Sequence, residues 1–112
     1  MKKNNLNVMK CSACSGNTPK LTNEEISTHL RQLIKWQVND EGNMIFKKFK
    51  FNNFKKSLEF LNLIGEIAEF ESHHPDSSIG WGYCLVMLHT HAIKGLSLND
   101  FIVASKIDLL SI

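Results

Sequence analysis

The sequence predicts a small α+β domain in which helices cover one face of an antiparallel sheet. Three observations support this prediction. The chain has 112 residues, a length that fits one domain. Apolar residues recur with helical spacing in three separate stretches, and segments with β character lie between these stretches. The predicted order is therefore helix, β-hairpin, helix, β region, helix.

The first helix is expected to begin after Thr22. Thr22 and Glu25 form a capping-box pattern, and an apolar stripe follows at helical spacing: Ile26, Leu30, Leu33 and Ile34. The residues before it are polar and show no periodicity. We therefore expect a flexible N-terminal arm over residues 1–20 and a domain over residues 21–112.

A β-hairpin is expected next. Trp36 and Val38 alternate with polar residues, residues 39–43 have turn composition, and residues 44–51 have strand composition. The alternation is imperfect at Lys47 and Lys48, which is compatible with a bulge.

The second helix is expected from its cap at Asn53 to about Ser72, because the chain must leave the helix before Pro75. Residues 76–80 are turn-like. Residues 83–90 are almost all apolar and predict a strand that is buried on both faces. The third helix begins at the cap Ser97, with Asp100 at the third helical position.

Composition excludes several classes of protein. The net charge is +2, with 13 basic and 11 acidic residues, and this balance does not predict nucleic-acid binding. No apolar run approaches the roughly 18 residues that a membrane span requires. The N-terminus lacks the apolar core of a secretory signal. We therefore expect a cytoplasmic protein whose cysteines stay reduced.

Histidines are concentrated in one part of the sequence. His73, His74, His89 and His91 lie within 19 residues, whereas His29 lies on the first helix and is expected to be exposed. Histidine can give and take protons near neutral pH, because its ordinary pKa is about 6.5. The cluster follows the end of a helix and the end of a strand, where rigid elements commonly hold functional side chains. It indicates a proton-transfer site.

Several of these side chains also have structural interpretations. His74 could bond the last carbonyl groups of the preceding helix. His89 is interpreted as a half-buried strand residue. Asp100 could serve only as the capping acid. Trp81 could form a wall of the pocket, but it is expected to pack in the core.

A metal site is the competing prediction. His89 and His91, with His73 or His74, could supply imidazoles to zinc or iron. A nearby carboxylate could complete the ligand set: Glu69, Glu71, Asp76 or Asp100. The sequence contains no recognised ligand spacing such as a helical His-Glu-x-x-His.

Cys11 and Cys14 have the spacing of half a zinc site. The other half is missing, because the remaining cysteine, Cys84, falls in the strand that is expected to be buried. We interpret the pair as free thiols on the arm, with a transient disulfide or a metal shared between subunits as the alternatives.

The histidine region resembles the signature of the pterin-4a-carbinolamine dehydratases. The similarity lies in Glu69, the His73-His74-Pro75 run, Trp81, His91 and Asp100 at allowed spacings, and it extends over about residues 20–110. The resemblance implies a two-layer fold with a four-stranded antiparallel sheet and three helices packed on one face. It also implies cytoplasmic homodimers or homotetramers that use no metal and no cofactor.

By this resemblance, the reaction removes water from 4a-hydroxytetrahydropterin and gives the quinonoid dihydropterin. It recycles the cofactor of aromatic amino-acid hydroxylases. The resemblance assigns acid/base roles to His73 and His91, and it makes His74 the residue that chiefly holds the substrate. The remaining substrate-binding positions that it implies are Glu69, Pro75, Thr90, Ala92, Ile93 and Asp100.

One position departs from the family pattern, and two other functions stay open. His89 stands where the family leads us to expect a small or hydroxyl residue. Animal members of the family also act as dimerisation partners of a transcription factor, so an adaptor role is an alternative. A metal-dependent enzyme that uses the same histidines is the other.

Overall fold

A computed structural model describes residues 6–13 and 15–110. The elements, in chain order, are η1 (Leu6–Val8), α1 (Asn23–Leu30), β1 (Gln37–Val38), β2 (Ile45–Lys50), α2 (Phe54–Glu71), β3 (Asp76–Gly80), β4 (Tyr83–Leu88), η2 (His91–Ile93) and α3 (Leu98–Asp108). The strands form one antiparallel sheet in the order β1-β2-β4-β3. This confirms the predicted α+β fold with four strands and three helices.

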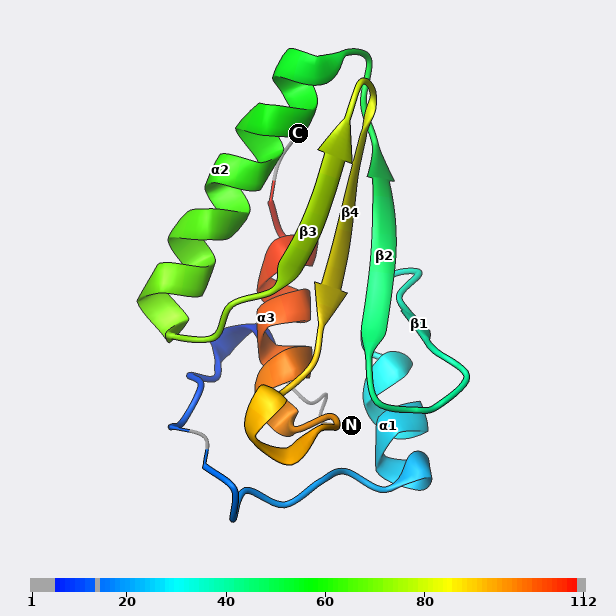
Figure 1. Ribbon diagram of the computed structural model, residues 1–112, viewed down its shortest axis with the longest axis vertical. Helices are drawn as coiled ribbons and strands as arrows, with labels where there is room; N and C mark the ends of the chain where they lie inside the picture. Colours follow the sequence, from blue (N-terminus) through cyan, green and yellow to red (C-terminus); the bar gives the residue numbers. More distant parts are fainter. Residues whose placement is uncertain (1–5, 14, 111–112) are drawn as a thin grey trace.

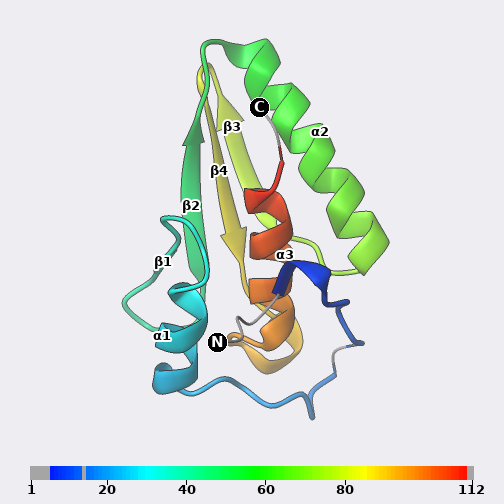
Figure 2. The same cartoon turned by 180° about the vertical axis from the view of Figure 1, so that it is seen from behind.

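The two layers are visible from opposite sides of the molecule. Figure 1 shows the sheet with α3 behind it, and Figure 2 shows α1 and α3 in front of the sheet. The α2 helix packs against β3, β4 and α3. One face of the sheet is therefore covered by helices, and no element among the described residues covers the other face.

The strand β4 has one buried and one partly exposed face, so the expectation of burial on both faces is wrong. Cys84, Val86 and Leu88 are fully buried towards the helices, whereas Leu85 and Met87 on the other face are only half-buried. The helices cover a single layer, and nothing in the described chain covers the second face of this strand. Because side chains alternate between the two faces, only residues on the same face of β4 and its continuation can contact one another.

Lys47 explains the imperfect alternation in the hairpin. The register from Ile45 opposite Leu88 to Lys50 opposite Tyr83 is continuous, so β2 contains no bulge. The side chain of Lys47 points to the helix face, where its ammonium lies 3.0 Å from the carboxylate of Asp108. The lysine thus occupies an inward position because a buried acid is there to pair with it.

Two expected elements differ from the structure. The α1 helix ends at Leu30, and Ile34, which was placed on its apolar stripe, is exposed. Residues 76–80 form the edge strand β3 and not a turn. A polar stretch can form a strand here because β4 supplies its hydrogen-bonding partners on one side.

The described part of the N-terminal arm lies against the domain. Leu6 is buried in the main core, and the Cys11 N–H donates to the carboxylate of Glu71 at 2.8 Å. Ser12 and Asn99 of α3 exchange two hydrogen bonds. The predicted flexibility of residues 1–20 stays a prediction, and Cys14 lies outside the described residues.

Candidate functional site

His73 is held in a buried position by the end of α2. Ser72 caps this helix in the left-handed conformation, and the His73 N–H donates back to the Ala68 carbonyl at 3.2 Å. This reversal turns the chain towards α3. The His73 ring is almost fully buried, with Nε2 2.7 Å from Oδ1 of Asp100.

Asp100 is fully buried and serves two purposes at once. Its Oδ2 accepts hydrogen bonds from the Ser97 N–H at 3.0 Å and the Thr90 hydroxyl at 2.8 Å, while Oδ1 faces His73. The Thr90 hydroxyl also lies 2.7 Å from the Ser97 hydroxyl. Asp100 is therefore not only the capping acid: Oδ2 caps α3, and Oδ1 contacts His73.

This arrangement determines where the His73 ring can exchange a proton. If the carboxylate of Asp100 is ionised, it can only accept, so Nε2 of His73 carries a hydrogen and donates it. In the neutral ring the lone pair is then on Nδ1. The buried pair thus selects one tautomer of His73.

His74 lies next to this buried pair in sequence but on the surface. Its Nε2 is 2.6 Å from Oε2 of Glu69, and both side chains are largely exposed. A pair this exposed adds little stability. Glu69, His74 and Pro75 line a hollow of about 230 Å³ beside α2.

His91 lies in η2, just beyond the end of β4, and is exposed. Its ring centroid is 4.2 Å from that of His89, and both rings line a hollow of about 360 Å³ with Asn43, Met44 and Lys94. His89 is half-buried, as expected, and its Nε2 lies 3.2 Å from Oδ2 of Asp76.

The other predicted binding positions differ in how accessible they are. Ala92 is exposed, and Pro75 is half-buried. Thr90 and Ile93 are buried, so their side chains do not face solvent. Any contact that these two residues make with a ligand would have to use their backbone.

The predicted residues gather at one end of the sheet, in three groups. His73, Thr90 and Asp100 form the buried group, Glu69 and His74 the first exposed group, and His91 lies in the second exposed group with His89. The antiparallel pairing of β3 with β4 brings the groups together, because β3 begins where β4 ends.

The position of Asp76 beside two histidines is the feature of this region that the sequence indicated least clearly. It was one of four carboxylates considered for a metal, and the structure selects it as the one beside His89 and His91. The pairing of β3 with β4 could have indicated this position. It was missed because residues 76–80 were interpreted as a turn and not as a strand.

Two other expectations were wrong. Trp81 lies at the β3–β4 turn, at the opposite end of the hairpin from His91, and 74% of it is exposed. His29 is half-buried against Phe101, with ring centroids 5.3 Å apart, and this burial lowers its pKa below the ordinary value.

The cysteine thiols that the structure describes are poorly suited to chemistry. Burial, together with the negative charge of Glu71, raises the pKa of Cys11 to about 12. Burial raises the pKa of Cys84 to about 11. Such thiols hold almost no thiolate near neutral pH.

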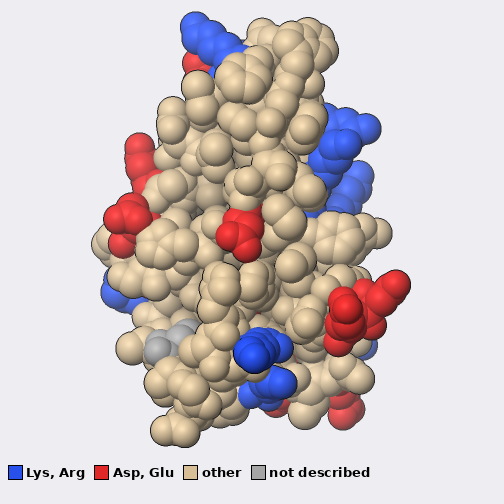
Figure 3. Space-filling view, viewed as in Figure 1, with Lys and Arg blue, Asp and Glu red and all other residues tan. Residues whose placement is uncertain are grey.

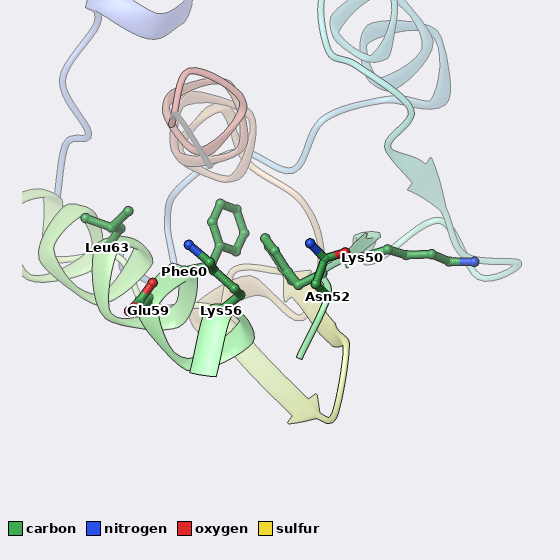
Figure 4. Close-up of a pocket in the computed structure, with 7 residues that line it drawn as sticks. Lys50, Asn52, Lys56, Glu59, Phe60 and Leu63 are labelled. Carbon is green, nitrogen blue, oxygen red and sulfur yellow. The ribbon is translucent and has the colours of Figure 1, made fainter. Parts of the chain in front are cut away.

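A further hollow of about 550 Å³ lies at the other end of β2, between this strand and the first turns of α2 (Figure 4). It contains none of the predicted site residues. Its lining residues are Lys50, Phe51, Asn52, Lys56, Glu59, Phe60 and Leu63. Lys50 and Lys56 are exposed, and Figure 3 shows Lys and Arg side chains gathered at the upper right of the face in view.

Among the described residues, no helix is long and apolar enough to cross a lipid bilayer.

Comparison with known proteins identifies relatives along most of the chain. The family model described as "Pterin 4 alpha carbinolamine dehydratase" matches residues 19–110. A protein of Methylococcus capsulatus named "Putative pterin-4-alpha-carbinolamine dehydratase" is 43% identical over 106 residues, which are 95% of this chain and 93% of the relative. A protein of Rickettsia canadensis with the same name is 49% identical over 104 residues, covering 92% of this chain and 94% of the relative.

Solved structures agree with these matches. The crystal structure of a "transcriptional coactivator/pterin dehydratase" from Brucella melitensis has a TM-score of 0.75 and 31% sequence identity. The similarity covers 80% of this chain and 95% of that one.

Proposed function

The chain belongs to the pterin 4 alpha carbinolamine dehydratase family, and we propose that it removes water from 4a-hydroxytetrahydropterin to give the quinonoid dihydropterin. The observation that carries this proposal is the gathering of all the family's motif residues except Trp81 at one end of the sheet. The buried pair of His73 with Asp100 lies there, and so do His74 and His91.

The reaction needs one acid and one base. The C4a–O bond breaks as the leaving hydroxyl group accepts a proton, N5 loses its proton, and the C4a–N5 double bond forms. We infer that His73 and His91 exchange these two protons. General acid–base catalysis of this kind typically contributes about 10²–10⁴-fold.

The buried pair supports a base role for His73. Asp100 directs the hydrogen of the ring to Nε2, so Nδ1 carries the lone pair that a base needs. The same carboxylate favours the imidazolium that forms when the ring accepts a proton. Asp100 is therefore a positioning residue in this proposal.

His74 and Glu69 form the proposed binding side. Both side chains line a hollow with Pro75 and are largely exposed, so their polar atoms outside the mutual contact can bond the polar edge of a pterin ring. Ala92 lies on the surface beside His91, and Thr90 and Ile93 would shape the pocket through their backbone.

The test is the decay of the carbinolamine's ultraviolet absorbance, compared with its spontaneous rate. Wild-type protein should accelerate the decay, and His74→Ala should lose most of the acceleration through a raised KM. His74 is exposed, so this variant should keep the wild-type circular dichroism spectrum. A wild-type protein that does not accelerate the decay would refute the proposal.

Two exposed glutamates on α2 offer a matched control. Glu69→Gln should raise KM because Glu69 lies at the proposed site, whereas Glu66→Gln, one turn earlier on the same helix, should leave KM unchanged. Equal KM values for the two variants would remove Glu69 from the binding side.

The cellular setting belongs to the same proposal. We infer a cytoplasmic homodimer or homotetramer that recycles the pterin of an aromatic amino-acid hydroxylase. Sedimentation would measure the oligomeric state, and loss of hydroxylase activity in cells that lack this protein would test the link.

An adaptor role is the second candidate function. The observation that favours it is the name of the Brucella melitensis relative, which joins coactivator and dehydratase. A pull-down from the source cell should recover a transcription factor with both wild type and His74→Ala if the adaptor role is independent of the histidines.

A further inference from the structure

The open face of the sheet carries a second cluster of histidine and carboxylate groups. Asp76 begins β3 opposite Met87 of β4, and His89 follows two residues later. Side chains two residues apart in an extended segment point to the same face, so His89 is the diagonal neighbour of Asp76. His91 completes the cluster from η2.

The three groups lie close together in space. Nε2 of His89 is 3.2 Å from Oδ2 of Asp76, and the His89 and His91 rings are 4.2 Å apart between centroids. One ligand atom from each of the three residues lies within 4.8 Å of the others.

These distances are near those of a metal site. Two ligand atoms at zinc-like bond lengths of about 2.0–2.1 Å in a tetrahedron lie about 3.3 Å apart. The distance of 3.2 Å between Oδ2 of Asp76 and Nε2 of His89 is already close to this value. The ligand nitrogen of His91 must move towards these two atoms by about 1.5 Å or less. His91 and Asp76 are exposed, so small side-chain rotations can close the gap.

The chemistry of the cluster also fits a metal ion. Two imidazoles and one carboxylate form a typical ligand set for divalent transition metals. The exposed location leaves a fourth position for water. Lys94 adds a positive charge to the hollow that His89 and His91 line, which opposes cation binding, while Asp76 supplies one negative charge to the cluster.

We propose that Asp76, His89 and His91 bind one divalent transition-metal ion, of which Zn²⁺ is the representative. The site is separate from the buried pair of His73 with Asp100, which lies towards the helices. His91 has a role in both proposals, because it is a metal ligand here and a proton-transfer residue in the proposed dehydratase reaction.

This connection gives the site a consequence that rests on the proposed function. A ring nitrogen of His91 that is bonded to zinc cannot exchange a proton with the pterin. Zinc binding should therefore inhibit the dehydratase and not activate it.

Zinc binding is tested without reference to activity. Tag-free protein is titrated with ZnCl₂ by calorimetry, and its complex with Co²⁺ is examined for the visible absorption bands of tetrahedral coordination. Wild type should bind one zinc ion per chain. Asp76→Asn, His89→Gln and His91→Gln should each weaken binding about tenfold or more.

The exposed pair of His74 with Glu69 is the matched control, because it is another histidine–carboxylate contact of similar length. His74→Gln should bind zinc like wild type. Binding by His89→Gln that equals wild type, or no wild-type binding up to about 0.1 mM zinc, would overturn the proposal.

The activity assay then separates the two proposals. His89→Gln should dehydrate the carbinolamine at the wild-type rate without zinc and should resist inhibition by zinc. Zinc inhibition that is equal in wild type and His89→Gln would overturn the regulatory consequence. A protein that binds zinc at this site but has no dehydratase activity would refute the proposed function alone.

Discussion

Replacing Asp100 tests the buried pair on which the proposed chemistry depends. In Asp100→Ala, the Ser97 N–H and the Nε2–H of His73 both lose their acceptor, while the Thr90 hydroxyl can still bond Ser97. Each buried donor without a partner costs about 1–3 kcal/mol. We therefore expect the free energy of unfolding to fall by about 2–6 kcal/mol, out of roughly 5–15 kcal/mol for a domain.

The Asp100→Asn variant separates stability from chemistry. The amide oxygen can replace Oδ2 and accept from Ser97 and Thr90, so the stability loss should be only about 1–2 kcal/mol. The amide nitrogen then faces His73 and donates to Nε2, which moves the ring hydrogen to Nδ1. This exchange reverses the tautomer that the proposed base requires.

Urea unfolding and the carbinolamine assay measure the two effects together. Asp100→Asn should lower kcat about 10²-fold or more with a small change in stability, since general acid–base catalysis is worth at least this much. The reasoning fails if Asp100→Ala unfolds within about 1 kcal/mol of wild type. It also fails if Asp100→Asn keeps the wild-type kcat.

Three further predictions concern other buried groups. Asp108→Asn should lower the free energy of unfolding by about 3 kcal/mol, because it leaves the Lys47 ammonium unpaired, and a loss under 1 kcal/mol in urea unfolding would contradict this. Burial alone would raise the pKa of Glu71, but the hydrogen bond from the Cys11 N–H and the ammonium of Lys106 hold it below its ordinary value of 4.5. The stabilisation by the Glu71 carboxylate is therefore present above pH 4.5 and is lost as the pH falls through the lower pKa of the folded state. Glu71→Gln should flatten this part of the curve of unfolding free energy against pH. Parallel curves for the variant and the wild type would refute the assignment. Cys11 in the native protein should react with iodoacetamide about 10³-fold more slowly than an ordinary thiol, because its pKa of about 12 leaves little thiolate. Peptide mapping after timed labelling measures this rate, and rapid labelling of Cys11 would contradict the prediction.

The second helix shows what local sequence signals can predict. Its bounds were expected from Asn53 to about Ser72, and the structure has the helix at Phe54–Glu71 with these two residues as its caps. A cap and a following proline act on their own neighbours, so no knowledge of the fold was needed.

The edge strand and Lys47 show where such signals fail. Asp76 to Gly80 have little strand character, and their conformation depends on hydrogen bonds from β4. Lys47 points inward because Asp108, 61 residues away in sequence, lies opposite. Interactions of this kind arise only once the chain is folded.

The histidine site was predicted only in part for the same reason. His73, His74 and His91 could be selected from the family motif; the structure places them at one end of the sheet, and their roles stay predictions. The division into a buried and two exposed groups depends on the alternation of β4 and on the register of β3. The meeting of Asp76 with His89 therefore became visible only in the structure.

The docking of residues 6–13 against α3 makes this leading segment part of the folding unit. The family match begins at residue 19, whereas the core that surrounds Phe101 also includes Leu6. A shortened chain that kept only the matched residues would open a gap in this core and remove the backbone partner of Glu71. Transplanting this domain into another protein, or recombining it with a relative, should therefore preserve the leading segment as part of the same cooperative structure.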